Sequence, residues 1–120
     1  MAAVVRRAAY AVAMPDARIV QREAFGHFAA GRVDEAVAGY RRALALDPKL
    51  AIAWNGLAMA LERAGDLDGA IEAARRLIEL EPDEALGHTS LSRFYQQKGM
   101  IPEAEDEAAI ATKLALRKKD

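Results

Sequence analysis

Two polar side chains in this sequence have the spacing of a catalytic pair. His88 and Ser92 lie four positions apart, so on a helix they would share one face, where the imidazole could accept the proton of the hydroxyl. The sequence provides no third group to orient the histidine and no indication of an oxyanion site. We therefore expect no catalytic residue and no enzymatic activity.

Metal ligands are also scarce. The 120 residues include no cysteine, which excludes a disulfide framework and a thiolate zinc site. The acidic residues between 103 and 107 have no histidine at metal-ligand spacing, so we expect them to form the solvated start of a helix. We predict no metal and no cofactor, and the absence of cysteine favours a cytoplasmic location.

Charge and hydropathy narrow the range of partners. A formal net charge of −1 argues against nucleic acid as the main partner. No uninterrupted apolar run reaches the ~20 residues that cross a bilayer, so no membrane insertion is expected. The partner that remains is another protein or a peptide.

The elements that position these residues follow a period of 34 residues. The residues in register are Gly31, Gly65 and Gly99, then Ala36, Ala70 and Ala104, and finally Pro48 and Pro82. A fixed period of this length is typical of stacked helix–turn–helix units. Such units build extended surfaces rather than enclosed pockets.

Local signals in the central unit predict two antiparallel helices. Apolar residues recur at helical spacing over 51–64 and again over 68–80. The small residues Ala58 and Ala70 would let the two helices approach closely. Gly65 is expected to end the first helix, because glycine readily adopts a positive φ.

Aspartates and prolines mark further helix boundaries. Asp68 is predicted to cap the second helix of the central unit, and Asp34 to do the same in the unit before it. Pro82 would stop the second helix, and Asp83 is the next candidate cap. Pro102 is well placed in the first turn of the last helix.

The unit over 51–84 resembles the tetratricopeptide repeat, whose pattern has Trp, Leu-Gly, Tyr, Ala, Phe and Pro at these spacings. The corresponding positions hold Trp54, Leu57, Ala58, Leu61, Ala70, Ala74 and Pro82. Ala58, Leu61 and Ala74 replace the Gly, Tyr and Phe of the pattern. The pattern recurs in phase, less completely, over 17–50 and 85–116. The resemblance implies an all-α, right-handed superhelical solenoid of antiparallel helix pairs, with its three repeats in one domain over 17–120.

Apolar positions of the repeat carry three residues with polar groups. Trp54 is expected to be buried between the helices of the central unit and against the first unit. His88 stands in the position that Trp54 fills, and His27 in the position that Leu61 fills. We therefore interpret both histidines as packing residues.

The two ends of the array raise separate questions. Residues 1–16 are predicted to form a short extra helix, which either caps the first repeat or binds a partner. We expect no solvating helix after the last repeat, which leaves a face around Ile110, Leu114 and Leu116. That face either joins two copies, giving a homo-oligomer through the terminal helices, or is exposed, alanine-rich surface.

In the tetratricopeptide family, the first helices of successive repeats line a concave groove. The resemblance places these candidate peptide-binding residues there: Arg18, Gln21, Arg22, Phe25 and Phe28; Ile52, Asn55, Met59 and Arg63; Leu86, Thr89, Arg93 and Gln96, with Glu62 and Gln97 beside them. The apolar members would form a strip flanked by arginines. A peptide with hydrophobic anchors and an acidic or carboxylate group would fit such a groove.

The function that the resemblance implies is a protein–protein interaction adaptor or scaffold that binds a peptide segment. Two alternatives stay open: the interaction segment of a larger enzyme or of a secretion or assembly component, and a self-associating scaffold. Some relatives clamp the carboxylate of Hsp90 or Hsp70 tails, which the resemblance does not imply here. The positions of that clamp hold Gln21, Phe25, Gly56, Leu86 and Ser90 instead of its basic and asparagine residues.

Overall fold

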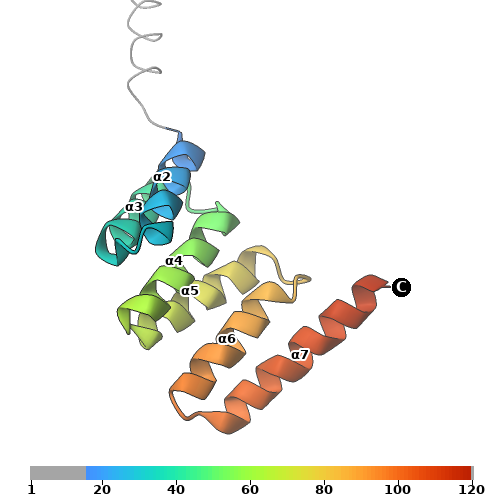
Figure 1. Ribbon diagram of the computed structural model, residues 1–120. Helices are drawn as coiled ribbons and strands as arrows, with labels where there is room; N and C mark the ends of the chain where they lie inside the picture. The colour runs from blue at the N-terminus through green and yellow to red at the C-terminus, as the bar shows by residue number, and fades with distance from the viewer. Residues whose placement is uncertain (1–15, 120) are drawn as a thin grey trace, which may run out of the picture.

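The computed structural model describes residues 16–119, which form helices joined by short turns. In chain order the helices are α2 (Ala17–Ala29), α3 (Val33–Leu46), α4 (Ala51–Ala64), α5 (Leu67–Leu80), α6 (Leu86–Gln97) and α7 (Ile101–Lys119). Figure 1 shows the hairpins α2/α3, α4/α5 and α6/α7 stacked in sequence. The predicted all-α repeat solenoid is confirmed, and the extra helix predicted at the N-terminus lies outside the described residues, which begin at Asp16.

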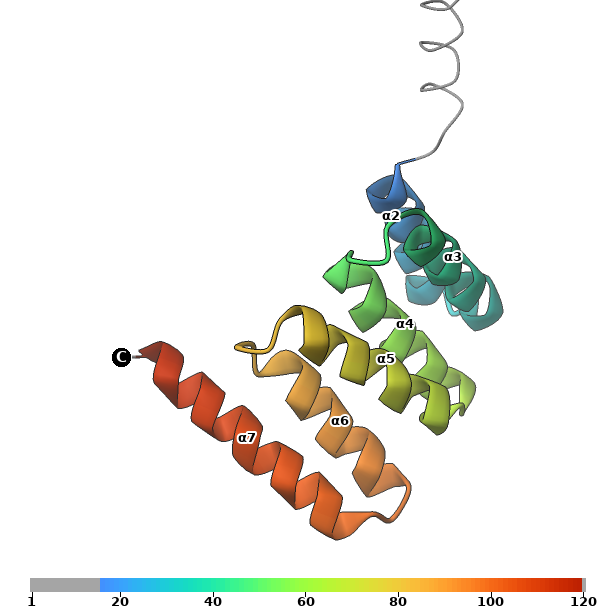
Figure 2. The ribbon, with the colours of Figure 1, turned by 180° about the vertical axis from the view of Figure 1, so that it is seen from behind.

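Neighbouring hairpins pack through a regular set of helix contacts. The second helix of each hairpin packs on the first helix of the next, so α3 contacts α4 and α5 contacts α6. In addition, α2 contacts α4 directly. Figure 2 shows the same succession from behind, with α7 at the far end of the array. The first helices α2 and α4 therefore form a continuous surface.

Small residues bring the helices of each hairpin close together. Ala36, Ala70 and Ala104, which share the 34-residue register, are 0%, 0% and 1% exposed. A Cβ added to Gly39 would lie 2.8 Å from the Cβ of Ala24, so α2 and α3 cross at a distance that favours glycine. The repeated small residues thus set the spacing within the hairpins.

Glycine ends the first helix of each hairpin. Gly31, Gly65 and Gly99 have φ values of 81°, 85° and 77°, the left-handed region that glycine enters at little cost. Gly65 is the C-cap of α4, as predicted, and its N–H donates to the carbonyl of Glu62. The three glycines spaced 34 residues apart therefore mark the same left-handed turn in each of the three hairpins.

The predicted cap of α5 is wrong. The N-cap is Asp66, whose side chain accepts a hydrogen bond from the N–H of Gly69 at 2.9 Å. Because Gly65 turns the chain at once, the helix starts two residues earlier than Asp68 would allow. Asp68 lies instead in the first turn, where its charge is favourable beside the helix N-terminus and pairs with Lys98.

The other two predicted aspartate caps are also wrong. Asp34 lies in the first turn of α3, whose N-cap is Arg32. Asp83 precedes α6 by a full turn, and the N-cap there is Ala85. The boundary signals from proline are confirmed, since α5 ends before Pro82 and Pro102 lies in the first turn of α7.

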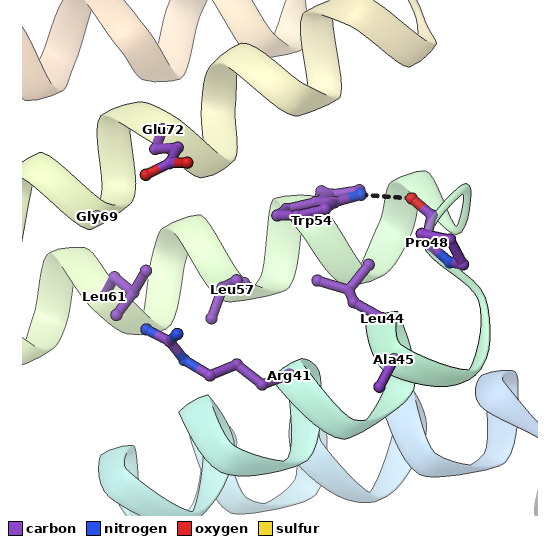
Figure 3. Close-up of a pocket in the computed structure, with 9 residues that line it drawn as sticks. All are labelled: Arg41, Leu44, Ala45, Pro48, Trp54, Leu57, Leu61, Gly69 and Glu72. Atoms are coloured by element: carbon purple, nitrogen blue, oxygen red, sulfur yellow. Dashed lines mark hydrogen bonds between the residues drawn. The ribbon is translucent and has the colours of Figure 1, made fainter.

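Trp54 is half-buried rather than buried, which corrects the prediction from the repeat pattern. Its ring lies at the surface where the first and second hairpins meet (Figure 3). The indole Nε1–H donates to the carbonyl of Pro48 at 2.8 Å. This hydrogen bond pairs the N–H of the indole at the surface, while the apolar part of the ring packs on the core.

The exposure of side chains on α7 corrects the predicted apolar face of the last helix. Leu114 is 8% exposed and packs inward, whereas Ile110 and Leu116 are 40% and 58% exposed. The predicted face therefore does not include Leu114, which is buried. Ile110 and Leu116 are the members of it that stay exposed.

Candidate functional site

A hollow of about 280 Å³ lies between α2 and α4. We call it the α2/α4 hollow, and it is lined by Gln21, Phe25, Phe28, Tyr40, Ile52, Asn55, Gly56 and Met59. Positions 21, 25 and 28 share one face of α2, and positions 52, 55 and 59 share one face of α4. Because α2 contacts α4, these two faces meet. The sequence predicted these six positions.

Apolar side chains dominate the mouth of the α2/α4 hollow. Phe25 and Ile52 are each 56% exposed, although both are large and hydrophobic. Phe28 is half-buried against the core. Large apolar side chains that gather around a concavity with few polar groups are typical of a binding site.

The charges near the α2/α4 hollow are predominantly positive. Within α2 and α4 the charged residues are Arg18, Arg22, Glu23, Glu62 and Arg63. Glu23 lines a separate hollow between α2 and α3, so it lies away from the α2/α4 surface. Arg18 and Arg22 lie one turn from Gln21 and Phe25 on the same face of α2.

Arg63 supports the aromatic wall of the hollow. Its Cζ atom lies 4.4 Å from the ring centroid of Phe28, within the range of a cation–π interaction. Because Arg63 belongs to α4 and Phe28 to α2, the contact also joins the first two repeats. The guanidinium thus brings a positive charge to the edge of the site.

Glu62 is the acidic residue on this surface, and it is paired. Its carboxylate accepts hydrogen bonds from Nε and Nη2 of Arg93, at 2.8 and 3.0 Å, and from the amide of Gln97 at 2.5 Å. The hydrogen bond from Arg93 lowers the pKa of Glu62, with a smaller contribution from Gln97, against the opposing effect of burial. This cluster links α4 to α6.

The pairing of Arg93 changes the role expected for this residue. The sequence placed it beside the groove as a partner for a ligand carboxylate. In the structure its guanidinium binds Glu62 with two hydrogen bonds and also contacts the sulfur of Met59 at 3.2 Å. Arg93 therefore joins the second and third repeats, and its replacement would weaken that joint.

The candidates from the third repeat do not line the hollow. Leu86 is 51% exposed on α6. Thr89 donates its hydroxyl hydrogen to the carbonyl of Ala85 within its own helix, and Gln96 is exposed. The cavity is therefore a feature of the first two repeats.

Sequence reasoning missed two residues of the α2/α4 hollow. Tyr40 belongs to α3 and is only 1% exposed, yet it lines the hollow. A Cβ added to Gly56 would lie 2.3 Å from Cε1 and 2.8 Å from the hydroxyl oxygen of Tyr40. The glycine in α4 therefore leaves the gap through which the end of the tyrosine ring reaches this surface. The sequence pattern gives no signal for this contact, because it depends on how closely the helices pack.

A second hollow, of about 440 Å³, lies between α3, α4 and α5 (Figure 3). We call it the Trp54 hollow. Its floor is formed by Leu57 and Leu61 of α4, each 5% exposed, and Arg41 and Glu72 line it from the neighbouring helices. It opens between second helices of the hairpins, away from the residues that the repeat pattern assigns to a partner.

The residues considered for catalysis have structural partners. The Ser92 hydroxyl donates to the carbonyl of Ala104 at 2.7 Å, and Nδ1 of His88 lies 2.6 Å from a carboxylate oxygen of Glu107. Both contacts join α6 to α7. Glu107 is consequently half-buried, which corrects the expectation that the whole acidic cluster is a solvated helix start.

Residues 16–119 contain no cluster of three or more potential metal ligands. Within the same range, no helix has both the length and the apolar character needed to cross a bilayer.

Residues 22–85 match the tetratricopeptide repeat family. The match covers more than half of the chain, so the chain belongs to this family, and it includes every residue that lines the α2/α4 hollow except Gln21. No curated protein matches the sequence.

Solved structures show how widely the arrangement is shared. A crystal structure of MamA is 25% identical and has a TM-score of 0.84, over 87% of this chain and 61% of that one. The chain thus spans about three-fifths of the length of this MamA structure. The second tetratricopeptide domain of Spaghetti (RPAP3), bound to the HSP90 peptide SRMEEVD, is 20% identical with a TM-score of 0.78, over 82% of this chain and 92% of that one.

A third similar structure is the type III secretion translocator chaperone SycD of Yersinia enterocolitica, in an alternative dimer. It is 22% identical with a TM-score of 0.81, over 85% of this chain and 77% of that one. At these identities, the RPAP3 and SycD structures establish the shared fold alone.

Proposed function

We propose that this chain is a protein-interaction module that binds a peptide segment of its partner along the surface of α2 and α4. The observation that carries this proposal is the α2/α4 hollow, where Phe25 and Ile52 stay more than half exposed beside a concavity. Exposing two large apolar side chains costs solvation free energy, which a partner would recover by covering them. The family membership and the peptide-bound RPAP3 domain support the same function.

The test is selection of binding peptides from a random display library on the immobilised chain. Affinities of selected peptides are then measured by fluorescence anisotropy. Ile52→Ser should weaken binding at least about tenfold, because the exposed anchor surface is lost. Leu46→Ser, at an exposed leucine of α3 outside the hollow, is the matched control and should bind normally. Equal affinity of both variants and wild type would exclude this surface.

Self-association is a second candidate function, favoured by the outer surface of α7. Ile110 and Leu116 are exposed there, and Ile101 at the start of the helix is 48% exposed. Burying such side chains against a second copy would stabilise a dimer. The predicted homo-oligomer through the terminal helices is thus retained as a proposal, restricted to these residues.

A further inference from the structure

Two buried polar side chains face the α2/α4 hollow. Tyr40 and Gln21 are only 1% and 7% exposed, and neither side chain forms a hydrogen bond to another described residue. Among these residues, no side-chain nitrogen or oxygen is both sealed from solvent and without a hydrogen-bond partner. Within residues 16–119, the polar ends of Tyr40 and Gln21 have no hydrogen-bond partner. Both residues line the α2/α4 hollow.

The packing of the repeats does not require polar side chains at the floor of this apolar concavity. Water in the hollow can hydrate the polar ends of Tyr40 and Gln21, so replacing either residue by an apolar one of similar shape should change stability little. The same groups are useful in recognition, because an apolar site with a few fixed polar groups orients its ligand. Burial raises the pKa of the Tyr40 phenol, so the hydroxyl stays protonated and can donate a hydrogen bond.

The size of the hollow indicates how much of a ligand enters it. About 280 Å³ is below the usual volume of a pocket that encloses a whole small molecule. It suits one large side chain of an extended peptide whose remaining residues lie along the surface. The charges around it indicate the rest of the ligand: Arg18 and Arg22 lie on α2 within one turn of Gln21 and Phe25, while Glu62 is neutralised by Arg93.

We propose that the α2/α4 hollow is a subsite for one apolar side chain of an acidic peptide, and that Tyr40 and Gln21 hydrogen-bond the peptide backbone at that residue. The side chain packs on Phe25, Phe28 and Met59. The Tyr40 hydroxyl donates to a backbone carbonyl, and the Gln21 amide can both donate and accept. Carboxylates on either side of the anchor residue pair with Arg18 and Arg22.

Gly56 has a specific function in this subsite. It lets the tyrosine ring of α3 pass between α2 and α4, so that a polar group from the second helix of one repeat reaches a surface built by first helices. Any side chain at position 56 would displace the ring. We therefore assign Tyr40, Gln21 and Gly56 as specificity-determining residues, an inference that depends on the proposed function of the same site.

The experiment uses fluorescein-labelled octapeptides with one central anchor, leucine, phenylalanine or alanine, flanked by glutamates. A second set has lysines in place of the glutamates. Anisotropy should detect binding of the leucine and phenylalanine peptides with glutamate flanks. The alanine anchor should lose about tenfold in affinity, and the lysine set should not bind. Binding of the lysine set as tightly as the glutamate set, or no binding of either, would overturn the acidic-peptide assignment.

Variants then separate this inference from the proposed function. Tyr40→Phe and Gln21→Met keep the shape of the floor, and each should lose about fivefold in affinity with an unchanged melting temperature. Tyr95→Phe is the matched control, because it removes a hydroxyl that accepts from Arg75 away from the hollow. If Ile52→Ser weakens binding while Tyr40→Phe and Gln21→Met bind as wild type, the proposed function stands and the role of the two polar groups is wrong.

Discussion

At Glu62, one carboxylate joins two repeats, and its protonation should weaken the joint. Arg93 and Gln97 both donate to it, and Arg93 lowers its pKa below the ordinary value of 4.5. A carboxyl group whose pKa is lower in the folded state than in the unfolded state stabilises the fold at pH values above its unfolded-state pKa. This contribution is lost as the pH falls through the folded-state pKa. The difference between wild type and Glu62→Gln should therefore be largest near neutral pH.

We expect Glu62→Gln to lower the free energy of unfolding by about 1 kcal/mol near pH 7, a modest value because the Arg93 side chain is partly exposed. The difference should shrink as the pH falls below the ordinary glutamate value of 4.5 and through the lowered folded-state pKa of Glu62. Urea unfolding at a series of pH values measures the difference. A gap that stays constant across the series would show that the ion pair contributes nothing through this carboxylate.

Trp54 tests how a half-buried aromatic stabilises a short array. Trp54→Ala should cost about 2 kcal/mol, less than full burial would give, because part of the ring already contacts water. Trp54→Phe should cost about 1 kcal/mol, since it keeps most of the ring and loses the bond to the Pro48 carbonyl. Thermal melts measure both. A Trp54→Ala melting temperature within about 2 °C of wild type would contradict the packing described.

At the residue scale, helix faces explain which candidate side chains lie together. The resemblance to the repeat family assigned Gln21, Phe25 and Ile52 to the groove, and they meet at the α2/α4 hollow because they lie on the facing sides of α2 and α4. Their role in peptide binding stays a prediction. Tyr40 could not be predicted, since its arrival depends on the gap at Gly56 and on how closely three helices pack. The pairing of Arg93 could not be predicted for a similar reason, because its partner Glu62 lies on another helix.

At the scale of helices and turns, two glycines should respond in opposite ways to alanine. Gly65 ends α4 with a φ of 85°, so Gly65→Ala should cost about 1–2 kcal/mol in backbone strain. Gly26 lies inside α2 with open space around its Cα, so Gly26→Ala should stabilise the fold by about 0.5–1 kcal/mol. Urea unfolding gives both values. The account of the turns would fail if the two substitutions shifted stability in the same direction.

The elements themselves were largely predictable, whereas their first residues were not. The glycines, alanines and prolines that recur every 34 residues predicted where the turns lie and where the helices pack closely. The capping aspartate of α5 was placed two residues late, because Asp66 and Asp68 both satisfy the composition rule for a cap. The choice between them depends on how soon after Gly65 the next helix begins, which the composition of the segment does not specify.

For the whole molecule, the exposed side of α7 should determine whether copies associate. If Ile110 and Leu116 form an interface, sedimentation velocity at rising concentration should show a dimer, and Ile110→Glu should return the chain to a monomer. Leu46→Glu, at an exposed leucine of α3, is a matched control that should not change the equilibrium. A monomer at all concentrations would identify the outer side of α7 as ordinary surface.

The sequence repeats predicted the stacking of the three hairpins, but they did not predict how many repeats line the α2/α4 hollow. The resemblance spread the candidate residues over three repeats, whereas the hollow occupies only the first two. At the joint between α4 and α6, Glu62, Arg93 and Gln97 form a hydrogen-bonded cluster and do not line the hollow. Single-repeat patterns do not describe such side-chain pairing between repeats.

The most direct test of the central claim is an NMR titration of the ¹⁵N-labelled chain with a display-selected peptide. Binding in the α2/α4 hollow predicts the largest amide shift changes at Gln21, Phe25, Ile52 and Met59, with little change along α7. The claim would be contradicted by changes that cluster around Trp54 and Leu57 of the Trp54 hollow, or along α7, while those four amides stay in place.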